Sequence, residues 1–273
     1  MRRFETIWLG TSENLAKHRS SKLVVNFTPT EVAHMHHQDS CSHQPSRSAF
    51  VASGFAALAA LVGAPALPAL AAGPVTRPTV SAATSLRRLV AGNQRFITGN
   101  ESYSDLATRR AGLVTSQAPF ATILTCSDAR TPPELIFNQS LGDLFVVRVA
   151  GNFVDDGGLG SMEYGYAMLH SHLVVVLGHE NCGAVHATYD AIKERAKLPP
   201  HYDTFQVDIG PGIAATIKAG GSLQDCVVAN AKYQAAQLPI RSTILAGGVK
   251  KKDLQIIAAT YLLKSGTVTF YGS

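Results

Sequence analysis

Two cysteines and one histidine stand out, because each lies at or just after the end of a short apolar run. Cys126 ends the run FATILTC, His179 ends HLVVVLGH, and Cys182 follows three residues later in HENCG. Thiolates and imidazoles are ligands that zinc prefers, and three protein ligands leave the fourth position of the ion open. The three residues therefore predict a catalytic zinc site. H-x-x-C alone is a weak signal, since a cysteine ending a buried strand is more often a small apolar residue.

The segment after Cys126 adds two charged side chains, Asp128 and Arg130, in SDAR. Residues two apart in an extended segment turn to the same side, so a bidentate ion pair is expected. An ordinary surface salt bridge is the alternative for these two residues taken singly. Pro132 and Pro133 follow directly and predict the start of a helix.

The apolar runs that carry these residues are typical of buried parallel strands. Residues 120–126, 143–151 and 172–179 are short, rich in β-branched residues and bounded by Pro, Gly or Asp. In open parallel sheets, ligands bind at the carboxyl ends of the strands. Cys126 and His179 fall at two such ends, where one ion could contact both.

Helical patterns alternate with these strands. The helices are expected within residues 81–97, 160–170, 183–197 and 222–237, and residues 254–272 predict a strand, a turn and a returning strand. The predicted fold class is α/β: a mainly parallel central β-sheet flanked by helices, with an N-terminal helical arm and a C-terminal antiparallel strand. GGLGSMEYG lacks the G-x-G-x-x-G spacing of a dinucleotide site.

The ordered pair CSDAR and HENCG resembles the signature of the β-class carbonic anhydrases, C-x-D-x-R followed by H-x-x-C-G. GDLFVVRVAGN and GSMEYGYAMLH are similar to the middle of that family, and the resemblance covers residues 84–273. It implies zinc-dependent, reversible hydration of carbon dioxide to bicarbonate and a proton. One Zn²⁺ per chain is the implied cofactor.

The resemblance also implies roles residue by residue. Cys126, His179 and Cys182 match the zinc ligands, and Asp128 with Arg130 matches the dyad that orients a zinc-bound hydroxide. Zinc lowers the pKa of a bound water to about 7, which supplies hydroxide at neutral pH.

Four further residues match positions that bind the substrate. Gln117 stands nine residues before Cys126, where the family has a glutamine, and the amide of Gly183 matches a donor to bicarbonate oxygen. Phe145 and Tyr164 match aromatic wall positions, the former usually contributed across a subunit interface. An aromatic residue at such spacing is more often part of a core.

Two other functions remain open at this stage. Hydrolases of carbon disulfide and carbonyl sulfide share the fold and the zinc ligands. Alternatively, the zinc is structural and the domain is an assembly module, with Asp128 as a permanent fourth ligand. In some relatives the matching carboxylate closes the site reversibly, and those carry a pocket with a tryptophan. Since the only tryptophan is Trp8, an open site is expected here.

Composition narrows the class of partner. The 273 residues are 46% hydrophobic and 16% charged, which is typical of a globular chain, with a formal net charge of +5. Removing residues 1–71 leaves 18 basic and 15 acidic residues, a net charge of +3. Neither nucleic acid nor an anionic membrane is expected as partner. The resemblance implies a small-molecule substrate, carbon dioxide or bicarbonate, and a homodimer or homotetramer.

The first 72 residues differ from the rest. Residues 50–72 are uncharged, follow Arg47 and reach Ala69-Leu70-Ala71, a small-x-small pattern typical of signal peptidase sites. A membrane anchor is the alternative, but two prolines interrupt the run. We expect three segments: a spurious or disordered extension (1–34), a signal peptide region of twin-arginine or general type (35–72) and a catalytic domain (73–273). The protein is then exported to the periplasm or beyond.

Overall fold

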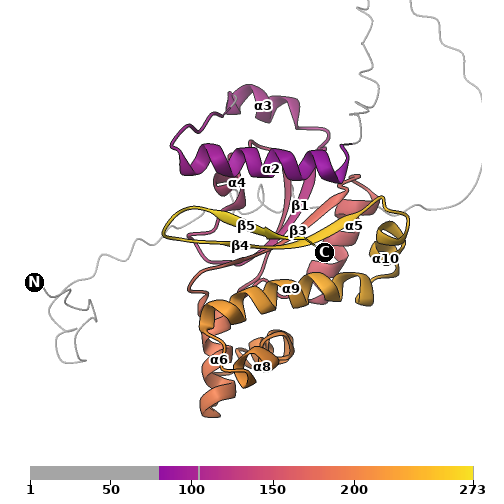
Figure 1. The fold of residues 1–273 in the computed structure, drawn as a ribbon. Coiled ribbons are helices and arrows are strands. Elements are labelled where there is room, and N and C mark those ends of the chain that lie inside the picture. Colours follow the sequence, from indigo (N-terminus) through magenta and orange to yellow (C-terminus); the bar gives the residue numbers. More distant parts are fainter. Residues whose placement is uncertain (1–79, 104, 273) are drawn as a thin grey trace, which may run out of the picture. The chain divides into compact units, whose positions relative to one another are not determined.

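The computed structural model describes residues 80–103 and 105–272 (Figure 1). The expected extension (1–34) and signal peptide region (35–72) lie outside these residues. Within the described range, none of the helices is both long and apolar enough to cross a membrane.

The centre of the fold is a five-stranded sheet in the order β2-β1-β3-β4-β5 (Figure 1). The first four strands in that order run parallel, and β5 is antiparallel to β4. This arrangement confirms the predicted mainly parallel sheet with an antiparallel strand at the C-terminal end. The strands are β1 (Ala121–Thr125), β2 (Leu144–Arg148), β3 (Leu173–His179), β4 (Gln255–Tyr261) and β5 (Val268–Tyr271).

One face of the sheet is covered by α2 (Ala82–Ile97) and the short α4 (Pro133–Ile136) (Figure 1). Ser81 caps α2, and Leu89 on its inner face is fully buried. Ser85 Oγ donates to the carbonyl of Phe120 at 2.7 Å, which ties the helix to the start of β1. The N-terminal helical arm thus packs on the sheet of its own chain, and α3 (Leu106–Gly112) lies outside it.

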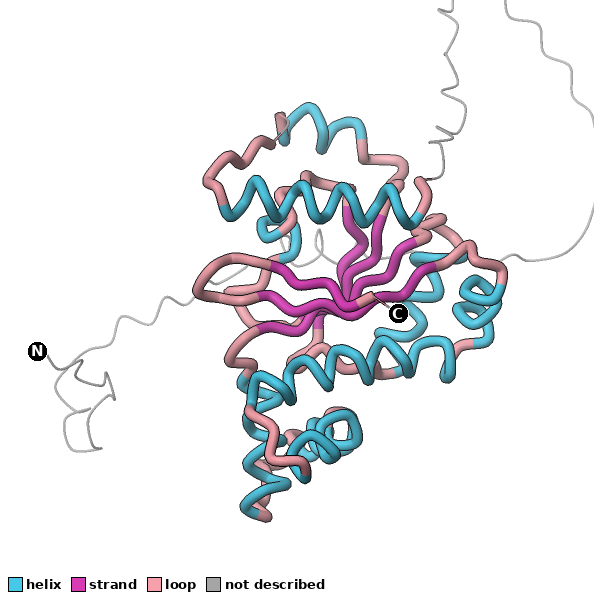
Figure 2. The backbone as a smooth tube through the Cα atoms, viewed as in Figure 1, coloured by secondary structure: helices cyan, strands magenta, loops and turns pink. Residues whose placement is uncertain are grey.

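The opposite face is covered by α5 (Asp156–Ala167), α9 (Leu223–Arg241) and α10 (Thr243–Lys250) (Figure 2). Successive side chains of a strand point to opposite faces, so β3 feeds both cores. Val175 and Leu177 pack toward α2, whereas Val174 and Val176 pack toward α9 and α10. All seven residues of β3 are buried, which explains the unbroken apolar run in its sequence.

Beyond the carboxyl ends of the strands lie α6 (Gly183–Glu194), α7 (Asp203–Asp208) and α8 (Gly210–Lys218). The sequence predicted that α6 would extend to residue 197, but it ends at Glu194, where Arg195 adopts a left-handed conformation with φ 53°. Ile209, Ile213 and Val227 pack with Cys126 and Cys182 in one buried cluster. Helices α7 and α8 therefore wall the edge of the sheet at which the predicted ligands lie.

Candidate metal centre

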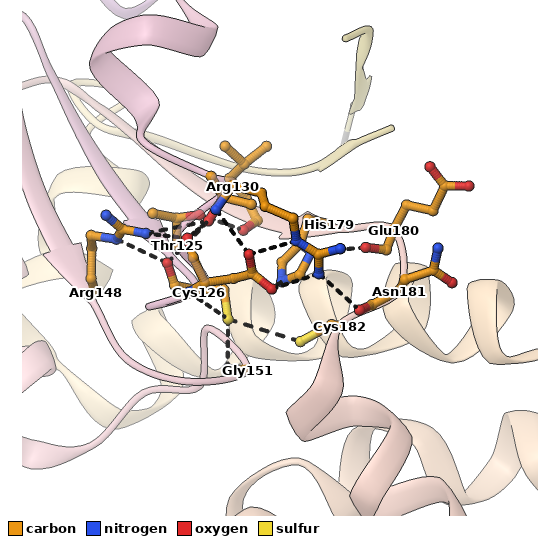
Figure 3. Close-up of polar contacts among 12 residues, drawn as sticks. Thr125, Cys126, Arg130, Arg148, Gly151, His179, Glu180, Asn181 and Cys182 are labelled. Atoms are coloured by element: carbon orange, nitrogen blue, oxygen red, sulfur yellow. Dashed lines mark hydrogen bonds and ion pairs between the residues drawn. The ribbon is translucent and has the colours of Figure 1, made fainter. Parts of the chain in front are cut away.

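The three predicted zinc ligands meet at one point of the structure (Figure 3). Cys126 directly follows β1, His179 is the last residue of the neighbouring β3, and Cys182 immediately precedes α6. Their ligand atoms all lie within 4.8 Å of one another, and all three residues are buried. Because β1 and β3 are adjacent and parallel, their carboxyl ends deliver Cys126 and His179 to the same edge.

The spacing of the donor atoms fits a tetrahedral zinc ion. The two Sγ atoms lie 3.9 Å apart. Two sulfurs bound to one tetrahedral ion at about 2.3 Å each would lie roughly 3.8 Å apart. The set of two sulfurs and one ring nitrogen is also the soft-to-borderline donor set that zinc selects.

One ring nitrogen of His179 forms a hydrogen bond, and the other has no partner among the described residues. Nδ1 lies 2.8 Å from the carbonyl oxygen of Glu180, to which it donates. Nε2 is buried and has no hydrogen-bond partner among the described residues. A buried polar atom without a partner is costly, and a metal ion would satisfy it. This unpaired nitrogen is the strongest sign in the structure that the three residues bind a metal.

The sulfur of Cys126 lies in a polar environment despite its burial. The amides of Gly151 and Asp128 approach it at 3.2 and 3.4 Å. The hydrogen bond between the two sulfurs lowers the pKa of Cys126 below its usual range and raises the pKa of Cys182. This shift favours the thiolate of Cys126, the form that binds metal.

Asp128 and Arg130 form the bidentate pair that their spacing predicted. Arg130 donates through Nε to Oδ1 at 2.9 Å and through Nη2 to Oδ2 at 2.7 Å, and its backbone amide donates to Oδ1 at 2.9 Å. The hydrogen bond from the Arg130 side chain holds the pKa of Asp128 well below its usual range. Oδ2 is also 3.9 Å from Nε2 of His179. A carboxylate that is ionised at neutral pH thus lies beside the metal ligands.

Arg148, at the end of β2, holds the loop that contains Cys126 and Asp128. Its Nε donates to the carbonyl of Cys126 at 2.9 Å, and its Nη2 donates to the carbonyl of Asp128 at 2.6 Å (Figure 3). The same Nη2 lies 3.4 Å from Oγ1 of Thr131. This role could not be predicted from the sequence, because the strand end and the loop meet only once β1 and β2 pair.

Gly183, whose amide the resemblance assigns to bicarbonate, lies directly after the ligand Cys182. It is the first residue of α6, directly after Cys182, and it is exposed. The first amides of a helix have no partner within the helix, so this one is free to donate to a bound anion. A Cβ at this position would meet no atom within 4 Å, so there is open space beside the Cα of Gly183.

Gln117, Phe145 and Tyr164 lie away from the three ligands of their own chain. Gln117 is exposed in the loop before β1, whereas Cys126 follows the strand, and a five-residue strand is roughly 16 Å long. Phe145 pairs in register with Thr122 near the start of β1, and its ring lies 6.1 Å from that of Tyr164 on α5. These residues therefore gather toward the amino ends of the strands, opposite to the metal ligands.

The remaining cysteine of the described residues is a free thiol. Cys226 on α9 is a buried free thiol in the apolar cluster beneath the metal ligands. Cys41, the fourth cysteine of the chain, lies outside the described residues.

Comparison with known proteins gives a consistent result. A family model described as carbonic anhydrase matches residues 121–268. The carbonic anhydrase of Mycolicibacterium smegmatis is 39% identical over 194 residues, which cover 70% of this chain and 94% of that protein. Carbonic anhydrase 2 of Mycobacterium tuberculosis is 36% identical over 192 residues, which cover 69% of this chain and 92% of that protein.

Among solved structures, the β-carbonic anhydrase CcaA superposes with a TM-score of 0.56 at 26% sequence identity. The match covers 68% of this chain and 87% of that chain. The family model thus spans β1 to β4 and the segments that contain the three ligands.

Proposed function

Because this chain belongs to the β-class carbonic anhydrase family and is an enzyme of that kind, we propose that it hydrates carbon dioxide reversibly to bicarbonate and a proton. Enzymes of this family use zinc, and Cys126, His179 and Cys182 are the residues that would hold it. The observation that carries the proposal is the buried, unpaired Nε2 of His179 beside two sulfurs 3.9 Å apart. When bound, zinc lowers the pKa of a water to about 7 and so supplies a nucleophile at neutral pH.

Asp128 would orient that nucleophile. As a carboxylate it can only accept hydrogen bonds, so it would accept one from the attacking group and fix the direction of that group's remaining lone pair. Arg130 keeps Asp128 ionised and fixes its plane through two parallel hydrogen bonds. The carboxylate is thereby engaged by the guanidinium, which supports an open site over one in which Asp128 is a permanent ligand.

The amide of Gly183 would bind the oxygen on which negative charge develops. It belongs to the first residue of α6, where the helix dipole also favours an anion. Bicarbonate carries a negative charge and carbon dioxide does not, so this donor favours the charged product-like state of the reaction.

The positions of Gln117, Phe145 and Tyr164 support a homodimer, or a homotetramer built from such dimers. These residues are too far along the strands to contact the metal ligands of their own chain, yet they match substrate-binding positions. Tyr164 is 48% exposed. Leu135 and Leu141, which lie between Gln117 and Phe145 in the sequence, are 50% and 45% exposed. A second copy that covered these apolar side chains would bring its Gln117 and Phe145 to the site of the first.

The signal peptide region (35–72) supports export. We propose that residues 35–72 direct the protein out of the cytoplasm and are removed. Mass measurement of the mature protein from its native host tests this directly: a chain that begins near residue 72 is expected, and a mature chain that retains residues 50–72 would contradict it.

The function is tested by measuring carbon dioxide hydration with the purified, zinc-loaded protein. Rapid zinc-dependent proton release is expected, and carbonyl sulfide and carbon disulfide should be poor substrates. A folded protein with one zinc per chain and no hydration activity would refute the proposal. Faster turnover of carbon disulfide than of carbon dioxide would instead favour the hydrolase alternative.

A further inference from the structure

A chain of buried side-chain amides leads from α9 to the sulfur of Cys126. The peptide of Gly151 forms its last link: its N–H donates to Cys126 Sγ at 3.2 Å, and its carbonyl oxygen accepts from Asn230 Nδ2 at 2.9 Å (Figure 3 draws the first of these). One peptide group thus joins a metal ligand to a side chain on α9. Asn230 is 79 residues from Gly151 in the sequence.

Asn230 is in turn held by Gln234, one helical turn further along α9. Gln234 Nε2 donates to Asn230 Oδ1 at 3.1 Å and to the carbonyl of Asp208 at 2.7 Å. Gln234 Oε1 accepts from the amide of Val154 at 3.1 Å. Both side chains are almost completely buried, with exposed fractions of 0% for Asn230 and 2% for Gln234.

The buried face of α9 is otherwise apolar, which makes these two amides conspicuous. Cys226, Val227, Ala231 and Leu238 occupy the rest of that face. Burying an amide side chain is unfavourable unless its hydrogen bonds are formed, and here the described partners are the loop after β2 and the end of α7. The polar residues therefore fix the segment from Gly151 to Val154 against the helix.

Gly151 cannot be replaced by a residue with a side chain without strain. Its φ is +85°, and a Cβ would lie 2.5 Å from Cδ1 of Ile209 and 3.0 Å from Cβ of Ala184. A glycine is needed for the peptide to turn its N–H toward the sulfur while its carbonyl faces α9. The orientation of this one peptide is therefore determined on both sides.

We propose that Asn230 and Gln234 are positioning residues of the metal centre, which aim the Gly151 amide at Cys126 and thereby tune the thiolate that binds the metal. An N–H···S hydrogen bond withdraws electron density from the sulfur, and groups around metal ligands govern the affinity and electronic properties of the site. The inference rests on the proposed zinc ligands but not on the identity of the substrate.

The test replaces Asn230 with leucine, which has a similar shape and cannot donate. Asn93→Leu is the matched control, because Asn93 is also a buried asparagine (5% exposed) whose amide donates to main-chain carbonyls, at Ile136 and Gly266. Those contacts join α2 to α4 and to the turn between β4 and β5, and they involve none of the metal ligands. Both variants are compared with wild type after replacement of zinc by cobalt.

Loss of the hydrogen bond raises the energy of the sulfur lone pairs. We expect the sulfur-to-cobalt charge-transfer band of Asn230→Leu to move to longer wavelength, and its zinc affinity, measured by competition with a chelator, to fall about 10-fold or more. Asn93→Leu should show the wild-type band and affinity even if it melts at a lower temperature. A folded Asn230→Leu protein with both properties unchanged would overturn the inference.

A measurement on wild type covers the case in which Asn230→Leu does not fold. With cadmium-113 in place of zinc, the Gly151 amide proton should show a scalar coupling to the metal through the sulfur. Absence of that coupling in the folded, loaded protein would also overturn the inference. Failure of wild type to bind cobalt or cadmium at all would count against the zinc ligands themselves, so the two failures are distinguishable.

Discussion

Oδ2 of Asp128 lies 3.9 Å from Nε2 of His179, while both carboxylate oxygens accept hydrogen bonds from Arg130. The carboxylate therefore borders the metal ligands without being free to turn toward them. Arg130 thus sets both the charge and the orientation of the carboxylate.

Asp128→Asn should lower kcat/KM for carbon dioxide by about 10²–10⁴-fold, because a neutral amide is a weaker hydrogen-bond acceptor for the nucleophile than a carboxylate. Zinc content should stay at one per chain, since Asp128 is not a ligand in the open site. Asp143→Asn is the matched control, because Asp143 pairs with Arg109 away from the metal centre. Loss of zinc in Asp128→Asn would indicate instead that the carboxylate is a ligand.

Arg130→Gln should raise the pKa of Asp128. The hydrogen bond from Arg130 lowers the pKa of Asp128 below its ordinary value of about 3.9, so the carboxylate is ionised at any pH above that value. The contribution of the pair to stability is likewise complete above pH of about 4 and is lost as the pH falls through the lower, folded pKa. In the variant the pKa of Asp128 rises toward its ordinary value, which is measured from the pH dependence of its carboxyl carbon's chemical shift. Arg109→Gln, which breaks the pair with Asp143, should leave the pKa of Asp128 in place.

Removing the metal in air should inactivate the protein in a way that zinc alone does not reverse. The two sulfurs lie 3.9 Å apart, and a disulfide needs about 2.05 Å, so a small movement lets Cys126 and Cys182 oxidise, with dioxygen taking the two electrons. A mass lower by two hydrogens and recovery with reductant plus zinc are expected. Full recovery on adding zinc without reductant would contradict this.

Two inactive variants should complement each other if the site is shared. Gln117→Ala keeps the metal ligands, and Cys126→Ala keeps Gln117. A hybrid dimer would contain one complete site, so random mixing of the two should restore about a quarter of wild-type activity. Mixing Cys126→Ala with Cys182→Ala is the control, because every site then lacks a ligand. Restoration in neither mixture would show that Gln117 does not act across subunits.

Much of the fold could be predicted because the strands are buried on both faces and read as unbroken apolar runs. The predicted strands at 120–126 and 172–179 contain β1 and β3, and the strand, turn and strand expected in 254–272 correspond to β4 and β5. Helices α3, α7, α8 and α10 were not predicted. They are short, and α7 and α8 depend on packing against α6 and α9 more than on a periodic pattern of their own.

The metal ligands could be predicted because zinc restricts ligand type and the sheet restricts ligand position. The hydrogen bonds around them could not. Arg148 and Asn230 contact the Cys126 loop and Gly151 only after distant segments pack, and nothing in their local sequence marks them. The one available signal was the pair of amides at positions 230 and 234, one turn apart on an otherwise apolar helix face.

His179 keeps its ring oriented through the carbonyl of the very next residue. Every amino acid has that carbonyl, so no single substitution at position 180 deletes it. Many metal sites assign this duty to a carboxylate elsewhere in the chain, which mutation can remove. Here the backbone sets the tautomer of the nitrogen ligand. Substitutions of the side chain at position 180 should therefore leave metal binding unchanged.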